Sequence, residues 1–264
     1  MKKPLIPLVA TVVVLGLGLW YYLVQRRVPA PPPALPAPSV APAPVPPPTH
    51  YPVPNTATAN GASAASLPAL VASDPALRVA LTGLIGADAV KAFLAPDQLI
   101  RRVVVTVDNL PRSKVPYDRL PVATTPGAFL VEGDAQHATL DVRNYARYTP
   151  MVDVLRKLDV RALAKVYFHF YPLFESAYQD LGYPDGYFND RLIAAIDLVL
   201  ATPLPQGPID LVQPHVQYHF ADPRLEALPA AEKILIRMGP ANAAIVKAKL
   251  AELRAALTAA PMAH

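Results

Sequence analysis

The chain of 264 residues contains no cysteine. This absence excludes disulfide bonds and every metal site that relies on thiolate ligands. Burial of apolar side chains must therefore stabilise whatever part of the chain folds. The composition is 53% hydrophobic, and that is enough apolar material for a core in one domain of ordinary size.

Acidic residues are also missing from the first 66 positions, where the charged residues are Lys2, Lys3, Arg26 and Arg27. The whole chain has 24 Lys and Arg against 20 Asp and Glu, so removing these four leaves 20 basic and 20 acidic residues after Ser66. Nucleic-acid binding needs a clustered basic surface. The balanced charge of the later region therefore predicts no nucleic-acid partner.

A run of 20 uncharged, mostly apolar residues extends from Leu5 to Val24. A helix of that length reaches about 30 Å, which is the thickness of the hydrocarbon core of a bilayer. The run predicts a single transmembrane helix over residues 5–24, after a tail of residues 1–4, with the membrane as a partner through Leu5–Val24. The alternative is a cleaved signal peptide, whose apolar region has about 7–15 residues.

Basic residues flank both ends of this run, so the orientation depends on a small difference. Lys2, Lys3 and the terminal amine slightly outweigh Arg26 and Arg27, which favours an inward N-terminus. We therefore predict a single-pass topology with the N-terminus inside and the body of the chain outside.

Residues 25–66 form a Pro/Ala-rich stretch, with 13 prolines among the 26 residues from Pro29 to Pro54. Such a composition cannot build a packed core and favours polyproline II. We predict a disordered linker that acts as a semi-rigid spacer. A ligand for SH3 or WW domains is the alternative, but Pro29–Pro54 contains no Lys or Arg.

Residues 67–260 are expected to form one compact domain, mainly α with minor β, followed by a tail of residues 261–264. Apolar residues recur with a 3.6-residue period over 99–110, which predicts a helix despite the β-branched side chains. Helices are predicted over 73–85, 88–94, 99–110, 148–158, 159–181 with an interruption at Pro172, 188–200, 230–238 and 242–257. One or two short hairpins are predicted from strands over 128–132, 138–142, 209–213 and 216–220, with Pro214 restricting the last two to an edge.

Short motifs follow one another through the second half of the chain: Asn144-Tyr145-x-Arg147-Tyr148, Leu181-Gly182-Tyr183-Pro184, Phe188-Asn189-Asp190-Arg191-Leu192, Phe220-Ala221-Asp222-Pro223-x-Leu225-Glu226, and Lys233 through Arg237-Met238-Gly239-Pro240. In this order they resemble a bacterial domain-of-unknown-function family, the one numbered 3014, from roughly residue 67 to the C-terminus. The resemblance implies a single-pass anchored envelope protein with a proline-rich spacer, and it implies no activity. Together with the favoured orientation, it predicts a protein of the bacterial inner membrane with a periplasmic C-terminal domain. One departure is Pro229, where the family is expected to have a serine that caps the next helix.

Eleven of the 19 Tyr and Phe residues lie between Tyr145 and Phe188. They predict either an aromatic cleft for a glycan or peptide, or a core. Positions 167, 171, 174 and 178 form one stripe of a helix, which favours a core. Buried tyrosines need partners for their hydroxyl groups. Residues of types Asn and Arg at 144, 147, 189 and 191 could supply them.

Carboxylates occur in the same region, at Glu175, Asp180, Asp185 and Asp190. Glycoside hydrolysis requires two carboxylates about 5–10 Å apart. A turn at Asp185 and a helix start at Asp190 explain two of these residues equally well. The sequence therefore leaves both interpretations open.

His215 and His219 would share one face of a helix and could then bind one metal ion. The alternation of residues 216–220 favours a strand instead, where the two side chains are about 13 Å apart. Asp222 is expected to cap a helical turn and to pair with Arg237 or Arg191, while Glu226 follows four residues later. No metal ion and no cofactor is predicted.

The function predicted from the sequence is a non-enzymatic binding or scaffolding module of the cell envelope. The alternative is a cell-wall hydrolase that uses Asp and Glu carboxylates in an aromatic-lined cleft. The expected partner is another envelope protein or a cell-wall component, and the oligomeric state stays open. The candidate ligand or partner site comprises Tyr145, Arg147, Tyr148, Tyr183, Tyr187, Asn189, Asp190, Arg191, Asp222, Glu226 and Arg237, without an assigned catalytic residue.

Overall fold

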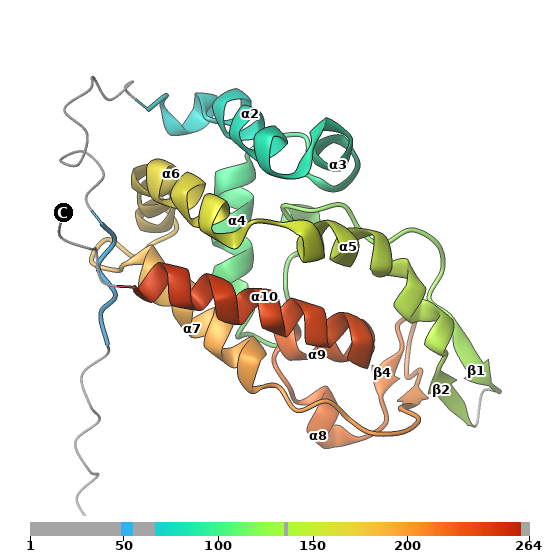
Figure 1. Cartoon of the computed structure of the whole chain (residues 1–264). Coiled ribbons are helices and arrows are strands. Elements are labelled where there is room, and N and C mark those ends of the chain that lie inside the picture. The colour runs from blue at the N-terminus through green and yellow to red at the C-terminus, as the bar shows by residue number, and fades with distance from the viewer. Residues whose placement is uncertain (1–48, 55–66, 135–136, 260–264) are drawn as a thin grey trace, which may run out of the picture. The chain divides into compact units, whose positions relative to one another are not determined.

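The computed structural model of the chain describes residues 49–54, 67–134 and 137–259 (Figure 1). The α-helices of these residues are α2 (Asp74–Ile85), α3 (Ala87–Phe93), α4 (Leu99–Asn109), α5 (Thr149–Lys157), α6 (Val160–Asp180), α7 (Phe188–Ala201), α8 (Pro223–Glu226), α9 (Ala230–Arg237) and α10 (Pro240–Thr258). Short 3₁₀ helices are η1 (Leu70–Ala72), η2 (Tyr117–Arg119) and η3 (Val142–Arg147). The strands are β1 (Val131–Gly133), β2 (Ala138–Leu140), β3 (Asp210–Val212) and β4 (His219–Phe220).

The mainly helical fold with a small sheet agrees with the sequence analysis, but the predicted membrane span requires a correction. None of the helices in the described ranges is long and apolar enough to cross a membrane. The proposed span Leu5–Val24 lies outside the described residues. The single-pass topology, the inner-membrane location and the periplasmic domain are therefore withdrawn. The predicted linker also lies outside these residues, apart from positions 49–54.

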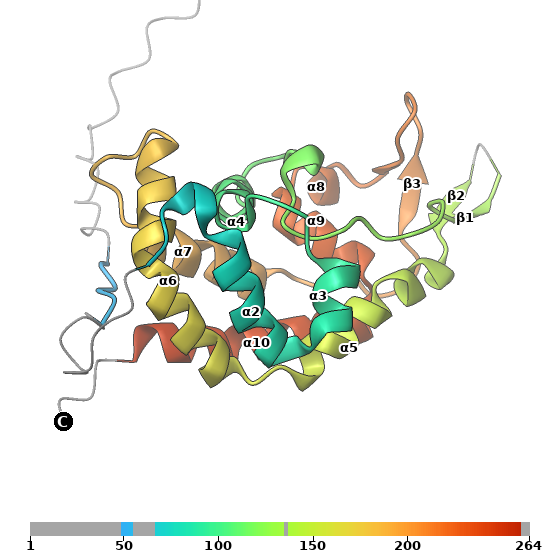
Figure 2. The ribbon, with the colours of Figure 1, turned by 90° about the horizontal axis from the view of Figure 1, so that it is seen from above.

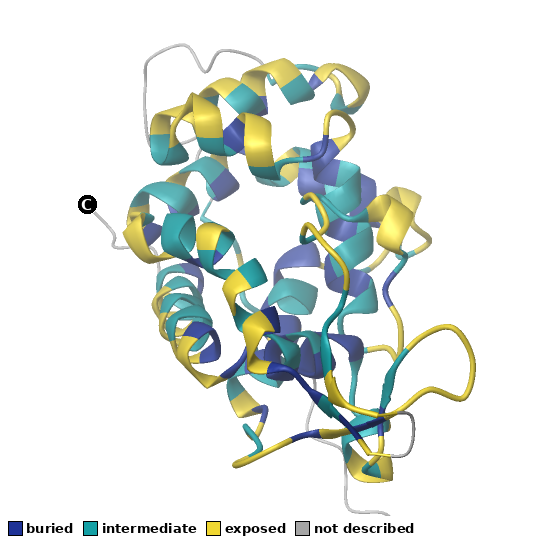
Figure 3. Ribbon diagram, turned by 90° about the vertical axis from the view of Figure 1, so that its right-hand side faces the viewer, coloured by how far each residue is buried: buried dark blue, intermediate teal, exposed yellow. Residues whose placement is uncertain are grey.

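The main core lies between helices that are far apart in the sequence. Buried apolar residues of α2, α4, α6, α7 and α10 form one cluster, with Phe188, Ile100 and Ile193 among the least exposed side chains. α10 packs along α5, α6 and α7. Figure 3 shows the buried positions on the inward faces of these helices and exposed residues on their outer faces.

Helix α4 confirms the argument from apolar spacing. Its buried residues include Leu99, Ile100 and Val104, which form one stripe facing α6 and α7. The run is rich in valine, a residue with a strand preference, but only a helix places these side chains on one face. Burial of that stripe therefore decides the local structure, since tertiary packing outweighs intrinsic propensity.

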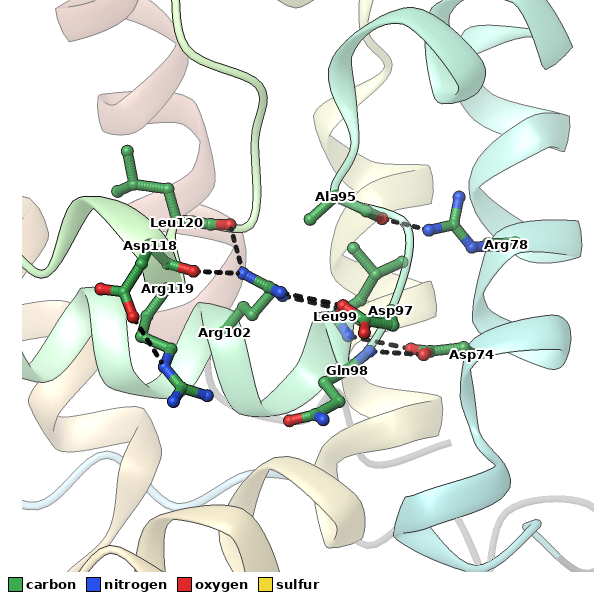
Figure 4. Close-up of polar contacts among 10 residues, drawn as sticks. All are labelled: Asp74, Arg78, Ala95, Asp97, Gln98, Leu99, Arg102, Asp118, Arg119 and Leu120. Carbon is green, nitrogen blue, oxygen red and sulfur yellow. Dashed lines mark hydrogen bonds and ion pairs between the residues drawn. The ribbon is translucent and has the colours of Figure 1, made fainter.

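The start of α4 is capped by a residue of another helix (Figure 4). Asp74 accepts hydrogen bonds from the backbone N–H groups of Gln98 at 2.5 Å and Leu99 at 2.9 Å. Gln98 has a positive φ of 52°, which turns the chain into the helix. Ser73, which precedes α2, does not cap that helix and donates its hydroxyl to the carbonyl of Leu70.

Arg102 ties two connecting segments to α4 (Figure 4). Its guanidinium donates to the Asp97 carbonyl at 2.9 Å and to the Asp118 carbonyl at 2.8 Å. A third contact reaches the Asp97 carboxylate at 2.8 Å. The planar, multidentate guanidinium can satisfy such dispersed acceptors at once, so Arg102 holds the loops before and after α4 in place.

Helix α6 begins as predicted, because the Asp159 side chain accepts hydrogen bonds from the N–H groups of Arg161 and Ala162. The interruption predicted at Pro172 is wrong, since α6 is continuous from Val160 to Asp180. A proline removes one hydrogen bond of the ladder. The buried residues on either side, Phe170 and Phe174, hold the helix together through packing.

The four strands form one antiparallel sheet in the order β1-β2-β3-β4. The predicted hairpin of β1 and β2 is confirmed, with Val131 opposite Leu140. The restriction of the other pair to an edge is wrong for β3, which lies between β2 and β4. Pro214 lies in the connection beyond Val212, so its missing N–H interrupts no ladder. The sheet lies at the opposite end of the folded unit from α6 (Figure 2).

Gly239 joins α9 to α10 in a conformation that favours glycine, with φ at +80°. A Cβ atom at this position would collide with the ring of Tyr145. Asn242 in the first turn of α10 donates to the Tyr145 carbonyl at 2.9 Å. Tyr145 is therefore part of the contact between η3 and the start of α10.

Candidate functional site

The residues predicted as a site lie in separate groups. Tyr187, Asn189 and Asp190 stand at the start of α7 and contact residues 50 and 51. Tyr183 and Arg191 belong to a buried cluster around an aspartate of α4. The others surround η3, the sheet and α8.

Two side chains at the start of α7 hold the backbone of Tyr51 at both of its polar groups. The Tyr51 N–H donates to Oδ1 of Asp190 at 2.8 Å. Nδ2 of Asn189 donates to the Tyr51 carbonyl at 2.9 Å. We call this pair, Asn189 and Asp190, the Tyr51 clamp. It recognises main-chain atoms, as sheet edges do when they bind an extended peptide.

His50 adds contacts through its side chain. Its Nδ1 lies 2.8 Å from Oδ2 of Asp190, so both oxygens of that carboxylate contact the segment. The imidazole ring also lies against the ring of Tyr187, with the centroids 4.1 Å apart. Tyr187 is 54% exposed, so about half of the residue remains in contact with solvent.

A tyrosine of helix α6 positions one side chain of the Tyr51 clamp. The hydroxyl of Tyr167 donates to Oδ1 of Asn189 at 3.0 Å. Since the carbonyl oxygen of the amide is occupied, its NH₂ group faces Tyr51. Asn189 is 0% exposed, so this orientation is fixed by buried partners. Burial raises the pKa of the Tyr167 hydroxyl, which stays a proton donor.

Glu175 fixes the start of α7 and is not free to act as a catalytic acid. Its Oε2 accepts the backbone N–H of Phe188 at 2.9 Å and the hydroxyl of Tyr171 at 2.6 Å. A carboxylate at the start of a helix satisfies an otherwise unpaired N–H group. Burial and the contact with Glu175 raise the pKa of Tyr171.

The side chain of Tyr51 packs against the main core, next to α10. It lies beside Arg254, whose pKa is raised first by the ion pair with Asp197 and further by Tyr51. Nη2 of Arg254 lies 3.1 Å from Oδ2 of Asp197 in α7. The site thus binds the backbone of Tyr51 through the clamp and its aromatic side chain through the apolar core and the neighbouring Arg254.

A buried carboxylate of α4 organises the second group. Asp108 is 3% exposed and pairs with Arg191 at 3.2 Å and with Arg112 at 2.7 Å. Tyr183 accepts from Arg112 at 3.1 Å and stacks on Tyr178, with ring centroids 4.6 Å apart. The sequence analysis missed Asp108, although an aspartate among the apolar residues of an amphipathic stretch is a signal of a buried ion pair.

Arg147 and Arg237 make structural contacts near η3 and the sheet. Arg147 donates to the carbonyls of Pro126 and Gly127, both at 2.9 Å. Arg237 lies over the ring of Phe220 at 4.8 Å from its centroid. Tyr148 lies beside both arginines, and burial raises its pKa. The predicted pairing of Asp222 with Arg237 or Arg191 is wrong.

Asp222 instead caps α8 by accepting the N–H of Arg224 at 2.8 Å, and it pairs with the Arg224 guanidinium at 2.9 Å. Glu226 joins the sheet to α8 and α9. It accepts the N–H of Phe220 at 2.9 Å and pairs with Lys233 at 3.1 Å. Both carboxylates of this group therefore have partners within the fold.

The other predictions about chemistry concern metal ions and pockets. Among the described residues, no group of three or more His, Asp or Glu side chains could hold a metal ion. His219 lies on β4, as the alternation indicated. A hollow of about 880 Å³ lies between the first turns of α6 and the end of α10, but no predicted site residue lines it.

The fold and the site define a mainly helical module in which the start of α7 holds residues 50 and 51 of the same chain. A family model described as "Protein of unknown function (DUF3014)" matches residues 99–254, which is more than half of the chain. The chain therefore belongs to this family, as its motifs indicated. No curated protein and no solved structure matches the chain. Residues 50 and 51 lie outside the matched range.

Sequence analysis missed His50 and Tyr51 as parts of a site because they stand within the proline-rich stretch. The available signal was their side chains. An imidazole and a phenol interrupt a run that otherwise consists of Pro, Ala, Val, Leu, Ser and Thr. Large aromatic side chains are typical anchors of binding segments.

Proposed function

We propose that the folded unit is a non-enzymatic binding module that holds an extended polypeptide segment through the Tyr51 clamp. The observation that carries this proposal is the double contact with one residue. The N–H and the carbonyl of Tyr51 are both bonded to side chains of adjacent residues, Asp190 and Asn189. A binding or scaffolding role was also the function predicted from the sequence.

The carboxylates support binding over catalysis. Asp190 contacts residues 50 and 51, Asp222 caps α8, and Glu226 accepts the N–H of Phe220. Two carboxylates facing each other across a cleft, as hydrolysis of a glycosidic bond needs, are not among these arrangements in the described residues. No observation favours the hydrolase alternative.

Rigid support of the clamp is a second argument for binding. Asn189 is fixed by Tyr167, and the N–H of Phe188 just before it is fixed by Glu175. A binding group whose orientation is fixed in advance loses little conformational entropy when it takes a ligand. The Tyr167 hydroxyl and the Glu175 carboxylate of α6 therefore hold the Tyr51 clamp in its binding orientation.

Amide hydrogen exchange in the full chain tests this proposal. Pro52 and Pro54 have no N–H, so few amides report on residues 49–54. We expect the Tyr51 amide to be protected in the wild type and to exchange freely in Asp190→Ala, because its acceptor is gone. Asp185→Ala, which removes an exposed carboxylate of the preceding loop, should keep the protection. Equal exchange in the wild type and in Asp190→Ala would contradict the proposal.

A further inference from the structure

The contacts of the Tyr51 clamp are not restricted to the sequence of residues 49–54. Asn189 and Asp190 bond to the backbone N–H and carbonyl of residue 51, which every residue except proline offers. Recognition of this kind supplies affinity, while neighbouring side-chain sites supply specificity. The surfaces around residues 51 and 52 therefore determine which side chains a bound segment can have at these positions.

The position of residue 51 selects an aromatic side chain. Tyr51 is partly buried against the main core and lies beside Arg254, which pairs with Asp197. Such a mixed environment suits an aromatic ring with a polar tip. A smaller side chain would leave the apolar part of this site unfilled.

The next position selects proline. Pro52 is exposed, and a proline there presents no N–H that would need a partner. A proline also restricts the preceding residue to an extended conformation. Tyr51 is therefore held, before binding, in the kind of conformation in which its N–H and carbonyl can reach Asp190 and Asn189.

We propose that the Tyr51 clamp takes an extended segment of a partner protein in which an aromatic residue directly precedes a proline, and that residues 50–52 of this chain are its internal competitor. This inference rests on the proposed function. It adds the class of ligand and a mode of regulation: the site is closed by its own segment until a better ligand replaces it.

Competition follows from the connection between the segment and the folded unit. A ligand joined to its site by a short connection has an effective concentration of about a millimolar. A partner segment must therefore bind the free site well below that value to displace His50 and Tyr51. Leaving the Asn189 amide without a partner is costly, so exchange favours ligands that restore both backbone contacts.

The test uses a fluorescent peptide with the sequence of residues 47–56 and the full chain. Tyr51→Ala removes the aromatic anchor of the internal segment, so this segment competes only weakly for the site in the variant. We expect saturable binding of the peptide to this variant by fluorescence anisotropy, and binding to the wild type about tenfold weaker or more, because the tethered segment competes. A peptide with alanine in place of its tyrosine should not bind.

Two further variants assign the binding to the clamp. In the Tyr51→Ala background, Asp190→Ala should weaken binding about 10- to 100-fold, since hydrogen bonds to a carboxylate are lost. Asp185→Ala is the matched control and should bind like Tyr51→Ala alone. Equal affinity of the wild type and Tyr51→Ala, or no effect of Asp190→Ala, would overturn the proposal.

Sedimentation velocity of the wild type separates this proposal from exchange between copies. We expect no dimer that depends on Tyr51. A concentration-dependent dimer that Tyr51→Ala abolishes would assign the site to a second copy and overturn the proposal of a partner. If the Tyr51 amide is protected in the wild type but the peptide does not bind Tyr51→Ala, this inference alone is refuted. If the Tyr51 amide is not protected in the wild type, the proposed function is refuted as well.

Discussion

The hydroxyl of Tyr167 in α6 donates to the side-chain carbonyl of Asn189 at the start of α7, across 3.0 Å. Both groups are buried, and 22 residues separate them in the sequence. This one bond determines which end of the Asn189 amide faces Tyr51. The geometry of the Tyr51 clamp therefore depends on Tyr167, whose hydroxyl contacts Asn189 and acts on the bound segment only through it.

Removal of that hydroxyl in Tyr167→Phe should destabilise the fold by about 1–3 kcal/mol, because the Asn189 carbonyl is left buried without its donor. Urea unfolding should show a lower midpoint at an unchanged slope. Tyr117→Phe, which removes an exposed hydroxyl group, is the control and should keep the wild-type midpoint. A midpoint for Tyr167→Phe equal to that of the control would show that the bond contributes nothing.

Asp74 lies in α2 but should stabilise the fold mainly through the cap that it provides for α4. Asp74→Ala leaves the N–H groups of Gln98 and Leu99 without their acceptor. We expect a loss of about 1–2 kcal/mol in the free energy of unfolding, the usual cost of removing a helix cap. Asp88→Ala removes an acidic residue from the first turn of α3 at an exposed position. Its expected cost is below about 0.5 kcal/mol, and similar costs for both variants would argue against the cap.

Replacement of Asp108, the carboxylate of α4, should destabilise the fold strongly. Asp108→Asn leaves the guanidinium of Arg191 without its buried charged partner, and breaking one half of such a pair costs about 3–5 kcal/mol. Chemical denaturation should therefore show a large shift of the midpoint. Asp118→Asn breaks the exposed ion pair with Arg119, where the carboxylate is 77% exposed. The control should change stability by less than about 1 kcal/mol.

Glu226 should make the fold sensitive to acid. Burial alone would raise its pKa, but the N–H of Phe220, Lys233 and His219 together lower it. The folded pKa is therefore below the unfolded value of about 4.3. Its stabilising contribution is present above that value and is lost as the pH falls through the folded pKa.

The test compares the wild type with Glu226→Gln at pH 7 and at about pH 3. The difference in unfolding free energy should be largest at pH 7 and should shrink in acid, as the wild-type carboxylate takes up a proton. Glu252→Gln, in an exposed ion pair with Lys249, should cost less at pH 7. A difference for Glu226→Gln that stays constant over this range would refute the assignment.

The sequence predicted well those elements whose signals are local. The period of residues 99–110 indicated α4, and Asp222 was predicted to cap the helical turn that it caps. At the start of α2 the two polar residues bond elsewhere, since Ser73 donates to Leu70 and Asp74 caps α4. A capping side chain has several acceptors and donors within reach, and packing decides among them.

Partners far apart in the sequence could not be predicted in this way. Asp108 and Arg191 are 83 residues apart, and Asn189 and Tyr51 are 138 apart. Candidate residues of the right types were found near the start of α7, since Asn189 and Asp190 belong to the predicted set. The predicted ion pair of Asp222 was wrong because many arginines were available and nothing in the spacing distinguished Arg224 from Arg237.

By itself, the sequence determined the helical class, the positions of most helices and the balanced charge of the region after residue 66, because hydrophobic period, caps and composition are properties of neighbouring residues. Only the tertiary structure decided that residues 50 and 51 bind the start of α7 and that Tyr167 orients the amide that holds them. Those contacts depend on how α6 and α7 pack, and the packing of two buried helix faces brings together side chains whose separation along the chain carries no local signal.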